Sequence, residues 1–403
     1  MKITFLTQYY PPEVGAPQAR LSELCRHFIQ RGHTVTVLAG MPNYPQGRIF
    51  DGYGGVIRNE THERLRIIRT FIYPTQKADF LHRLTNYFSF TLSSAFLGAV
   101  VLPKADFLFV ESPPLFLGLS GFWLSWLKRM RMIFNVSDLW PESAVQLGVL
   151  KKNSFGYRIS ARLEKFCYQQ AWLITGQSKS IMEDIRTRFP SRPTFHLSNG
   201  VDTKIFHPRR STQESREILG HGKDCVVFYA GLHGLAQGLE QALAAAHLLR
   251  SEVNLKFVLL GNGPTKGSLV ELARQSDLHN VCFLESRPAQ EIPALVAAAD
   301  IVLVPLKIYI TGAVPSKLYE AMASGRPVIL VASGEAAEIV RDHQTGIVVE
   351  PGDVASLVQA IRTLYTRPDL RKVFGENGRQ VAEKYYDRTT IAGGFIDHLE
   401  SCL

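Results

Sequence analysis

The sequence predicts an α/β protein made of two doubly wound domains, and three observations support this class. Short apolar runs of the kind that form buried strands alternate with helical stretches along the whole chain. The 403 residues are long for one hydrophobic core but suit two. The alternation restarts after Asn199-Gly200, a strong turn signal, so we place the domain boundary at residue 202.

Composition narrows the class further. Hydrophobic residues make up 46% of the chain and charged residues 20%, as in ordinary globular proteins. The five cysteines are scattered without a CxxC pair, so we expect reduced thiols, a cytoplasmic protein and no metal site. The net charge of +9 favours nucleotide phosphates or anionic lipid as partners. No nucleic-acid-binding motif accompanies this charge, so we expect no nucleic acid partner.

The N-terminal stretch predicts a βαβ unit and therefore a parallel sheet. Residues 3–6 form the first strand, 17–30 a helix with one apolar face, and 35–38 the next strand. Gly15 lies in the loop at the carboxyl end of the first strand, where open α/β sheets bind ligands. A GxGxxG fingerprint is absent, so Gly15 is either a ligand-facing residue or a flexible loop glycine.

Acidic residues follow two later strands of the first domain. The strand at 107–110 is followed by ESPP, and the strand at 132–136 by SDLWPES. Strand ends of a parallel sheet meet at one edge, so we expect these acidic residues to face one site. Asp138 and Glu142 could equally form an Asx turn and a helix-start charge.

Three stretches of the first domain suggest contact with a membrane. Residues 84–103 carry no charge and have the length of a membrane span, but six polar side chains also fit a core or interface-lying helix. Residues 116–127 contain aromatic side chains and are followed by three cations, which suits a lipid interface or an amphipathic core helix. The basic helix at 151–171 faces lipid headgroups or solvent.

The second domain shows the same alternation and three glycine-rich or polar loops after strands. The expected strands are 226–229, 257–260, 281–284, 301–305 and 328–331. Gly231, Gly234 and Gly238 stand at a strand–helix junction, where a glycine lets the backbone approach a pyrophosphate. Taken singly, each could be a packing glycine. The loops at 259–264 and 283–288 end neighbouring strands.

The stretch Gly312–Val328, GAVPSKLYEAMASGRPV, combines an anion site with a carboxylate. Pro315 suits the first helical turn, and Ser316 and Lys317 add a hydroxyl and a cation to the N–H groups there. Glu320 lies one turn further on nearly the same face, where it could hold a ribose. The alternative is a helix start with a surface glutamate.

Several of these segments, in this order, resemble the motifs of family 4 glycosyltransferases. They are NGVD at 199–202 with its following Phe and Pro, EAMASGRPV at 320–328, and DHQTGIVVEPGD at 342–353. The loop at 41–55 resembles bacterial N-acetylfucosaminyltransferase-like enzymes of surface-polysaccharide assembly. The resemblance implies the GT-B fold, with two Rossmann-like doubly wound domains, 1–202 and 203–384, facing each other across a cleft. The last residues, 385–403, would form a helix crossing back onto the first domain.

The resemblance also implies an activity. We expect metal- and cofactor-independent, retaining transfer from a UDP-sugar, such as a UDP-N-acetylamino sugar, with GDP-sugar open. The acceptor would be a polyprenyl-diphosphate-linked saccharide of O-antigen or capsule biosynthesis. The enzyme would be cytoplasmic and peripheral to the inner face of the membrane. A UDP-sugar epimerase and a catalytically silent scaffold remain alternatives.

Catalytic roles are expected for Asp138, Lys317 and Glu320. The donor would contact Gly15, Gly231, His233, Gly234, Gln237, Gly238, Asn262, Gly263, Arg287, Gly312, Ala313, Val314, Pro315 and Ser316 as well as Lys317 and Glu320.

The sequence departs from the family at two points. Leu232 and Gln237-Gly238 replace the usual arginine and lysine–glycine pair, so we expect Lys317 and Arg287 to supply the charge. Gly312 replaces the first glutamate of E-x7-E, so backbone N–H groups of 312–314 would act in its place.

Overall fold

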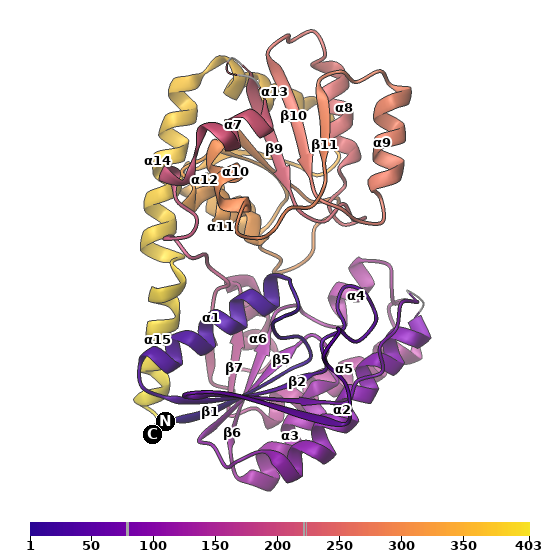
Figure 1. Cartoon of the computed structure of the whole chain (residues 1–403), viewed down its shortest axis with the longest axis vertical. Coiled ribbons are helices and arrows are strands. Elements are labelled where there is room, and N and C mark those ends of the chain that lie inside the picture. Colours follow the sequence, from indigo (N-terminus) through magenta and orange to yellow (C-terminus); the bar gives the residue numbers. More distant parts are fainter. Residues whose placement is uncertain (78–79, 221, 223) are drawn as a thin grey trace. The chain divides into compact units, whose positions relative to one another are not determined.

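Two sheets organise the chain in the computed structural model, which describes residues 1–77, 80–220, 222 and 224–403 (Figure 1). Each sheet belongs to its own compact unit. Unit 1 comprises residues 1–198 and 391–403, and unit 2 comprises residues 199–390. The predicted limits were 202 and 384. The chain around Val201 and the chain around Tyr386 both belong to unit 2 because they pair with each other. The Val201 N–H donates to the Tyr386 carbonyl, and the Arg388 N–H donates to the Val201 carbonyl.

Unit 1 contains an eight-stranded sheet of order β3-β4-β2-β1-β5-β6-β7-β8, parallel except for the antiparallel pair β3–β4. The strands are β1 Lys2–Thr7, β2 Thr34–Gly40, β3 Ile57–His62, β4 Leu65–Thr70, β5 Phe107–Ser112, β6 Arg131–Val136, β7 Leu173–Gly176 and β8 Thr194–His196. The helices are α1 Ala16–Gln30, α2 Phe80–Val101, α3 Leu117–Lys128, α4 Glu142–Gln146, α5 Phe155–Gln170, α6 Lys179–Arg188 and α15 Arg388–Glu400.

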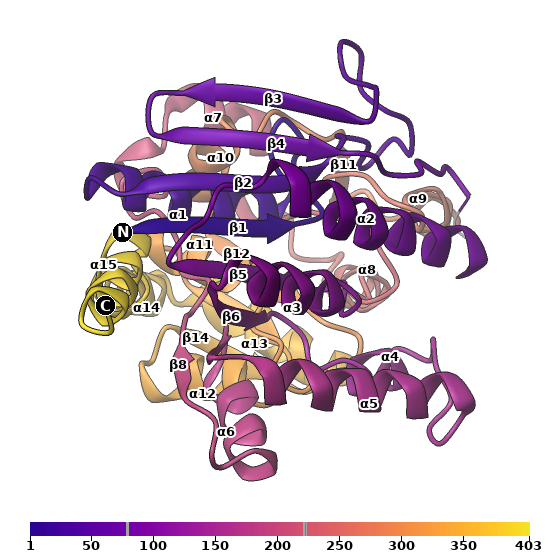
Figure 2. The ribbon, with the colours of Figure 1, turned by 90° about the horizontal axis from the view of Figure 1, so that it is seen from below.

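Helices cover both faces of this sheet because its strands are apolar on both sides. Leu6, Leu108 and Phe134 point into one core layer, with α2, α3, α5 and α6. Phe5 and Phe109 point the opposite way, onto α1 and α15. Alternate strand residues thus serve two cores, as the period of two requires. In Figure 2 α2, α3 and α5 lie along one side of the sheet, and Figure 1 shows α15 beside α1.

Unit 2 contains a six-stranded parallel sheet of order β11-β10-β9-β12-β13-β14. The strands are β9 Cys225–Ala230, β10 Leu255–Leu260, β11 Val281–Leu284, β12 Ile301–Pro305, β13 Val328–Val331 and β14 Gly346–Val349. The helices are η1 Pro208–Arg210, α7 Gln213–Leu219, α8 Glu240–Leu248, α9 Lys266–Gln275, α10 Ile292–Ala298, α11 Ser316–Ala323, α12 Glu335–Asp342, α13 Val354–Thr366 and α14 Pro368–Tyr385.

The strands of unit 2 also alternate between two cores. Val226 and Phe228 pack toward α10, α11, α12 and α14, whereas Val227 and Tyr229 pack toward α8, α9 and α13. Between β9 and β12 the strand order reverses, so their connections leave in opposite directions. Open α/β sheets bind ligands outside the carboxyl ends of strands at such a point. In unit 1 the corresponding reversal lies between β1 and β5.

Candidate functional site

In unit 2 the helix α11 begins directly beyond the reversal point. Pro315 is its N-cap, with extended backbone (φ −62°, ψ 131°), so the helix starts at Ser316, one residue later than predicted. No side chain caps this end. Among the hydrogen bonds of the described residues, none is donated by the backbone N–H groups of Ser316 and Lys317. The end of α11 therefore offers unpaired donors and the positive end of a helix dipole.

Lys317 lies over the first glycine of the β9–α8 loop. A Cβ atom added to Gly231 would sit 2.6 Å from the Lys317 Nζ and 2.3 Å from its Cε. The ammonium also lies 5.7 Å from the centre of the Tyr229 ring, within the range of a cation–π contact. The Tyr229 hydroxyl donates to the Leu232 carbonyl and so holds the ring under the loop. The missing side chain at Gly231 leaves the space that Lys317 occupies.

Two glycines bring the β10–α9 loop against the β9–α8 loop. A Cβ on Gly261 would lie 1.9 Å from the Gly231 carbonyl oxygen, and one on Gly263 would lie 2.4 Å from that of His233. Both glycines also have positive φ, 141° and 156°. Only glycine fits such a conformation and approach. Neighbouring Asn262 is exposed, and its side chain accepts from the Gly263 N–H.

His233, one of the predicted donor-binding residues, lies underneath these loops. Its side chain is fully buried between the rings of Tyr229 and Phe283. Burial, aided by the nearby Lys266 charge, lowers the pKa of His233, so the imidazole is neutral. Its carbonyl accepts hydrogen bonds from the Thr265 N–H and hydroxyl. These contacts give His233 a role in joining the two loops.

The other predicted residues of the β9–α8 loop form its tight turn. A Cβ on buried Gly234 would lie 2.8 Å from the Gln237 side-chain oxygen. Gly238 has a φ of 57°, and a Cβ there would lie 2.9 Å from that of Lys307. Gln237 is half-buried, so only part of its side-chain amide is accessible to a ligand.

Lys317 and Arg287 were expected to replace the charge of the family's usual arginine and lysine. The structure leaves one of them, Lys317, without an ion pair to a described carboxylate. Arg287 is exposed and forms an ion pair of 2.8 Å with Glu291, four residues further along the chain. Lys317 forms no ion pair with a described carboxylate and faces the glycine loop. Lys317 and the helix end therefore both supply positive charge at this edge of the sheet.

The segment before α11 supplies few further donors. Gly312 is buried with a φ of 77°, and the Ala313 N–H donates to the Ile310 carbonyl. Among the hydrogen bonds of the described residues, the N–H groups of Gly312 and Val314 donate none. Glu320 is half-buried, and its carboxylate has no hydrogen bond or ion pair to another described residue. An unpaired carboxylate one turn from the helix start is available to accept from hydroxyl groups.

In unit 1 a buried polar network occupies the reversal point. Glu111, at the end of β5, pairs with Arg20 of α1 at 2.5 Å and accepts from the Ser137 hydroxyl at 2.8 Å. The Asn135 amide donates to the other Glu111 oxygen at 3.0 Å, and Thr175 donates to Asn135 at 2.7 Å. Glu111 and Arg20 were not predicted. The ESPP strand end pointed to Glu111, but no local pattern indicated its partner, 91 residues away.

Asp138 follows Ser137 in the loop after β6, beside this network. Burial, together with the charge of Glu111, raises the pKa of Asp138 to about 6, although Arg20 opposes the shift. A carboxyl group with this pKa is largely ionised at neutral pH and can accept a proton. Gly15 is the N-cap of α1 on the same edge, with φ 171°, and a Cβ there would lie 2.5 Å from the Gln18 side-chain oxygen. The carboxyl groups of Glu111 and Asp138, the Arg20 guanidinium and the start of α1 thus all lie at this edge of the sheet.

A cavity of about 540 Å³ opens near the ends of β1 and β2 in unit 1. Its lining includes three tyrosines, two asparagines and two cations: Tyr9, Tyr44, Tyr87, Asn43, Asn86, Lys77 and Arg83. The rings of Tyr9 and Tyr44 lie 5.5 Å apart, and Gln8 donates to Asn86 at 2.6 Å. The loop at 41–55, which contains Asn43 and Tyr44, was named from the sequence for its resemblance, but no local pattern placed it beside the other lining residues.

Comparison with known proteins assigns both units. The “Glycosyl transferase 4-like domain” family matches residues 15–200, and “Glycosyl transferases group 1” matches residues 211–381. The Escherichia coli K12 protein WcaI, named a colanic acid biosynthesis glycosyl transferase, is 26% identical over 99% of this chain and 100% of its own. A GDP-mannose-dependent phosphatidylinositol monomannoside mannosyltransferase of Mycolicibacterium smegmatis is 33% identical over 49% of this chain and 55% of its own.

Among solved structures, Anabaena Alr3699/HepE in complex with UDP matches with a TM-score of 0.72 over 100% of both chains, at 19% identity. With the two domain families in order, these findings define the chain as a glycosyltransferase of the GT-B fold, each unit a Rossmann-like α/β domain. Within that class it belongs to the family 4 glycosyltransferases and is an enzyme of the hexosyltransferase type.

Proposed function

We propose that the protein transfers a sugar, with retention, from a UDP-sugar to a polyprenyl-diphosphate-linked saccharide in surface-polysaccharide biosynthesis. One observation carries this proposal: an uncapped helix start, the unpaired Lys317 and the unpaired carboxylate of Glu320 lie beside the glycine loops. The UDP in the HepE complex and the colanic acid role in the name of WcaI support the donor and the pathway. GDP remains the competing nucleotide because the mannosyltransferase relative is GDP-mannose-dependent.

Donor binding follows from the charges around α11. The diphosphate would lie between the N–H groups of Ser316 and Lys317 and the backbone of the loop at Gly231. The Lys317 ammonium offsets the charge that grows on the diphosphate as the glycosidic bond breaks. Glu320 would accept hydrogen bonds from the ribose hydroxyls. No metal ion is needed in this scheme, since the helix dipole and Lys317 stabilise the leaving group.

The acceptor would react through Asp138. The acceptor hydroxyl oxygen forms the new bond to the anomeric carbon while the diphosphate departs with the electron pair on the same face, which retains the configuration. Asp138 takes the hydroxyl proton. Burial and then the charge of Glu111 raise the pKa of Asp138, and Arg20 opposes this shift. We assign Glu111 and Arg20 as positioning residues.

The 540 Å³ cavity fits the saccharide–diphosphate end of such an acceptor. Tyrosine rings and asparagine amides suit a sugar, since they offer a flat apolar face and hydrogen bonds. Lys77 and Arg83 on the same wall would bind the acceptor diphosphate. A lipid-linked acceptor also requires a membrane nearby.

The surface of α2 supports membrane contact because its polarity is the reverse of that of an ordinary surface helix, whose polar side chains face the solvent. Its polar side chains point inward: Asn86 donates to the Tyr73 carbonyl, and Ser94 bonds Ser120 of α3. Phe90 packs into the core, but several large apolar side chains point outward, and Phe96 and Val100 are 67% and 81% exposed. By length and composition Leu81–Val101 could also cross a membrane, with a mean hydropathy of 1.3 and 28% of the window buried.

The neighbouring helices add aromatic and basic groups to that surface. Trp123 and Trp126 of α3 are exposed and stacked at 5.6 Å. The α5 helix adds Phe155, exposed to 77%, and the exposed cations Arg158 and Arg162. Tryptophan and cations beside apolar groups suit the interface of an anionic membrane. We infer that this face, formed by α2, α3 and α5, rests peripherally on the inner surface of the cytoplasmic membrane.

The test is a screen of UDP- and GDP-sugars with purified enzyme and a short-chain polyprenyl-diphosphate saccharide. We expect transfer from one UDP-sugar and an α-linked product from an α-linked donor, read by NMR of the anomeric proton. Inversion would refute the retaining mechanism. Isomerised donor formed without acceptor would identify an epimerase, and absence of saturable nucleotide binding would identify a scaffold. Transfer from GDP-sugars alone would overturn the choice of donor.

A further inference from the structure

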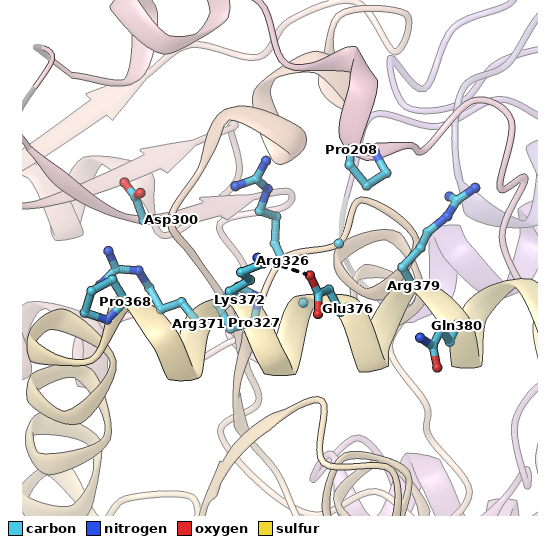
Figure 3. Close-up of a pocket in the computed structure, with 12 residues that line it drawn as sticks. Pro208, Asp300, Arg326, Pro327, Pro368, Arg371, Lys372, Glu376, Arg379 and Gln380 are labelled. Atoms are coloured by element: carbon cyan, nitrogen blue, oxygen red, sulfur yellow. Dashed lines mark ion pairs between the residues drawn. The ribbon is translucent and has the colours of Figure 1, made fainter.

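A second cationic cavity lies in unit 2, lined by one face of α14 and the turn between α11 and β13. Its volume is about 470 Å³, within the range of small-molecule sites. Arg371, Lys372 and Arg379 line it from α14, and Arg326 lines it from the turn (Figure 3). None of these residues belongs to the donor site described above.

Two glycines shape the floor of this cavity. A Cβ on Gly375 of α14 would lie 2.2 Å from the carbonyl oxygen of Gly325, and Gly325 itself has a φ of 65°. A Cβ on Gly325 would lie 2.8 Å from Pro208. The helix and the turn therefore touch through their backbones, and the long side chains around that contact form the walls.

The two carboxylates of the lining are already occupied. Asp300 pairs with Arg216 at 2.8 Å and accepts from the Val226 N–H. Glu376 lies 3.9 Å from Lys372 on the exposed rim. Arg379 is likewise neutralised, since it pairs with Glu383 at 2.6 Å and donates to three carbonyls.

Arg326 and Arg371 form no direct ion pair with a described carboxylate, although Asp300, paired with Arg216, also acts on Arg326 through its charge. Within the described parts of the chain, neither guanidinium has a carboxylate at ion-pair distance. Arg371 donates to the carbonyls of Leu364 and Tyr365 at the end of α13, which holds it in place without neutralising it. The Arg326 Nε is buried and has no hydrogen-bond partner there. In Figure 3 Arg326 rises between Asp300 and Pro208, opposite the α14 side chains.

We propose that this cavity binds a phosphate monoester of a small polar metabolite, with the phosphate between Arg326 and Arg371. Two guanidinium charges without a direct ion pair to a described carboxylate match the charge of about −2 that a phosphate monoester carries near neutral pH. Guanidinium groups also bind phosphate oxygens through paired hydrogen bonds, and a bound phosphate would satisfy the buried Arg326 Nε. The volume exceeds that of phosphate alone, which leaves room for the attached polar group.

The cavity lies at the far end of α11 from the proposed diphosphate contacts. Ser316 and Lys317 begin this helix, and Gly325 and Arg326 follow its last residue, Ala323. Phosphate bound at either end must therefore be distinguished by experiment.

Equilibrium dialysis with radiolabelled inorganic phosphate, at constant ionic strength and with excess UDP present, tests the site. We expect saturable binding of one phosphate per chain. Arg326→Gln and Arg371→Gln should each weaken it by roughly tenfold or more, the loss of one charged hydrogen-bonding partner. Arg210→Gln, a change of an exposed arginine outside the cavity, should leave phosphate binding unchanged. Lys317→Gln should also leave it unchanged.

Several results would overturn the proposal. They are absence of saturable binding, equal binding by wild type and both cavity variants, or loss of binding in Lys317→Gln with retention in Arg326→Gln. If both arginine variants fail to fold, Lys372→Glu reverses the charge of an exposed rim residue and should weaken phosphate binding several-fold. Unchanged affinity of that variant would count against the site. Because the readout is binding, a failure of the proposed transfer reaction would leave this result unaffected.

Discussion

At the scale of single residues, unpaired charge separates functional candidates from structural ones. Glu320 and Lys317 have no charged partner among the described residues, whereas Arg287 is engaged by Glu291. Buried charges are usually paired because desolvation penalises them otherwise. Side chains that escape pairing at the end of parallel strands are therefore those that a substrate can use.

Asp138→Asn should abolish most activity and stabilise the protein at neutral pH. Loss of a general base costs kcat roughly 100-fold or more. The pKa of Asp138 is raised to about 6 in the folded protein, so ionising this group destabilises the fold. The protein therefore has its full stability below the pKa of Asp138 in the unfolded chain and loses stability as the pH rises through about 6. Removing that cost should add roughly 1–2 kcal/mol at pH 7 and nothing at pH 3. Urea unfolding at both pH values measures this.

The pH profile provides the second readout for Asp138. The wild-type kcat/KM should rise with pH through an apparent pKa of about 6, because the base acts only when ionised. A profile flat between pH 5 and 8, or an active Asn variant, would exclude Asp138 as the base. Asp51, an exposed residue of the same unit, offers a control in Asp51→Asn.

Lys317→Ala and Glu320→Ala should affect different steps. In the proposed mechanism Lys317 stabilises charge that grows in the transition state, so its loss should lower kcat roughly 100-fold. We propose that Glu320 binds the ribose in ground and transition state alike, so its loss should weaken UDP binding roughly tenfold or more with a smaller effect on kcat. Steady-state kinetics and calorimetry with UDP separate the two. Lys204→Ala, an exposed change in unit 2, is the control. Wild-type values for both variants would refute the donor site.

At the scale of elements, the start of α11 and the polarity of α2 carry the functional argument. The α11 helix has eight residues and no side-chain cap, so its first N–H groups stay available. In α2, serine and asparagine side chains bond to the loop after β4 and to α3, while several large apolar side chains remain outside. An apolar surface of this kind commonly marks a membrane or partner interface.

The double change Leu92→Ser and Phe96→Ser on α2 should weaken vesicle binding without unfolding the protein. Both side chains are exposed in unit 1, so their loss costs little packing. Removing them should lower affinity for phosphatidylglycerol vesicles roughly tenfold or more, since each buried apolar side chain contributes about 1.5–3 kcal/mol. Sedimentation with vesicles measures the effect. Leu248→Ser, an equally exposed position of α8, is the matched control. Equal loss in both proteins, or none in either, would refute the assigned face.

At the scale of the whole molecule, the chain has two units, and each unit has its own hydrophobic cores and its own set of candidate site residues. Each sheet is buried on both faces by its own helices, and each reverses strand order at one point. Unit 2 contains the glycine-rich loops and the cations beside them. Unit 1 contains the buried carboxyl groups, the tyrosine-lined cavity and the exposed apolar face of α2, α3 and α5. We therefore expect a nucleotide to act on one unit alone.

UDP should stabilise unit 2 selectively. At about 100 times its Kd, UDP should add about 2.7 kcal/mol to the unit that binds it. Hydrogen exchange should slow in the loops at 231–238 and 261–263 and at the start of α11, with little change at Glu111 or Asp138. Glu320→Ala should reduce this protection. Protection confined to unit 1 would place the nucleotide elsewhere.

Local signals in the sequence determined most of the fold. The apolar runs and the turn at Asn199-Gly200 depend on neighbours a few residues away, so they could be read along the chain. The helix start at Ser316–Lys317 and the carboxylate of Glu320 could be read for the same reason. The hairpin β3–β4 was not identified, because β3 is largely exposed and lacks an apolar period.

Only the tertiary structure decided which side chains meet. The Arg20–Glu111 pair, the Lys317 ammonium over Gly231, the burial of His233 and the cavity at Arg326 all join segments far apart in the chain. Such contacts depend on strand order and on the approach of loops, and no short-range pattern encodes either. The sequence by itself therefore determined the class of fold and the place where α11 begins, while tertiary packing decided which charges are paired and which remain available.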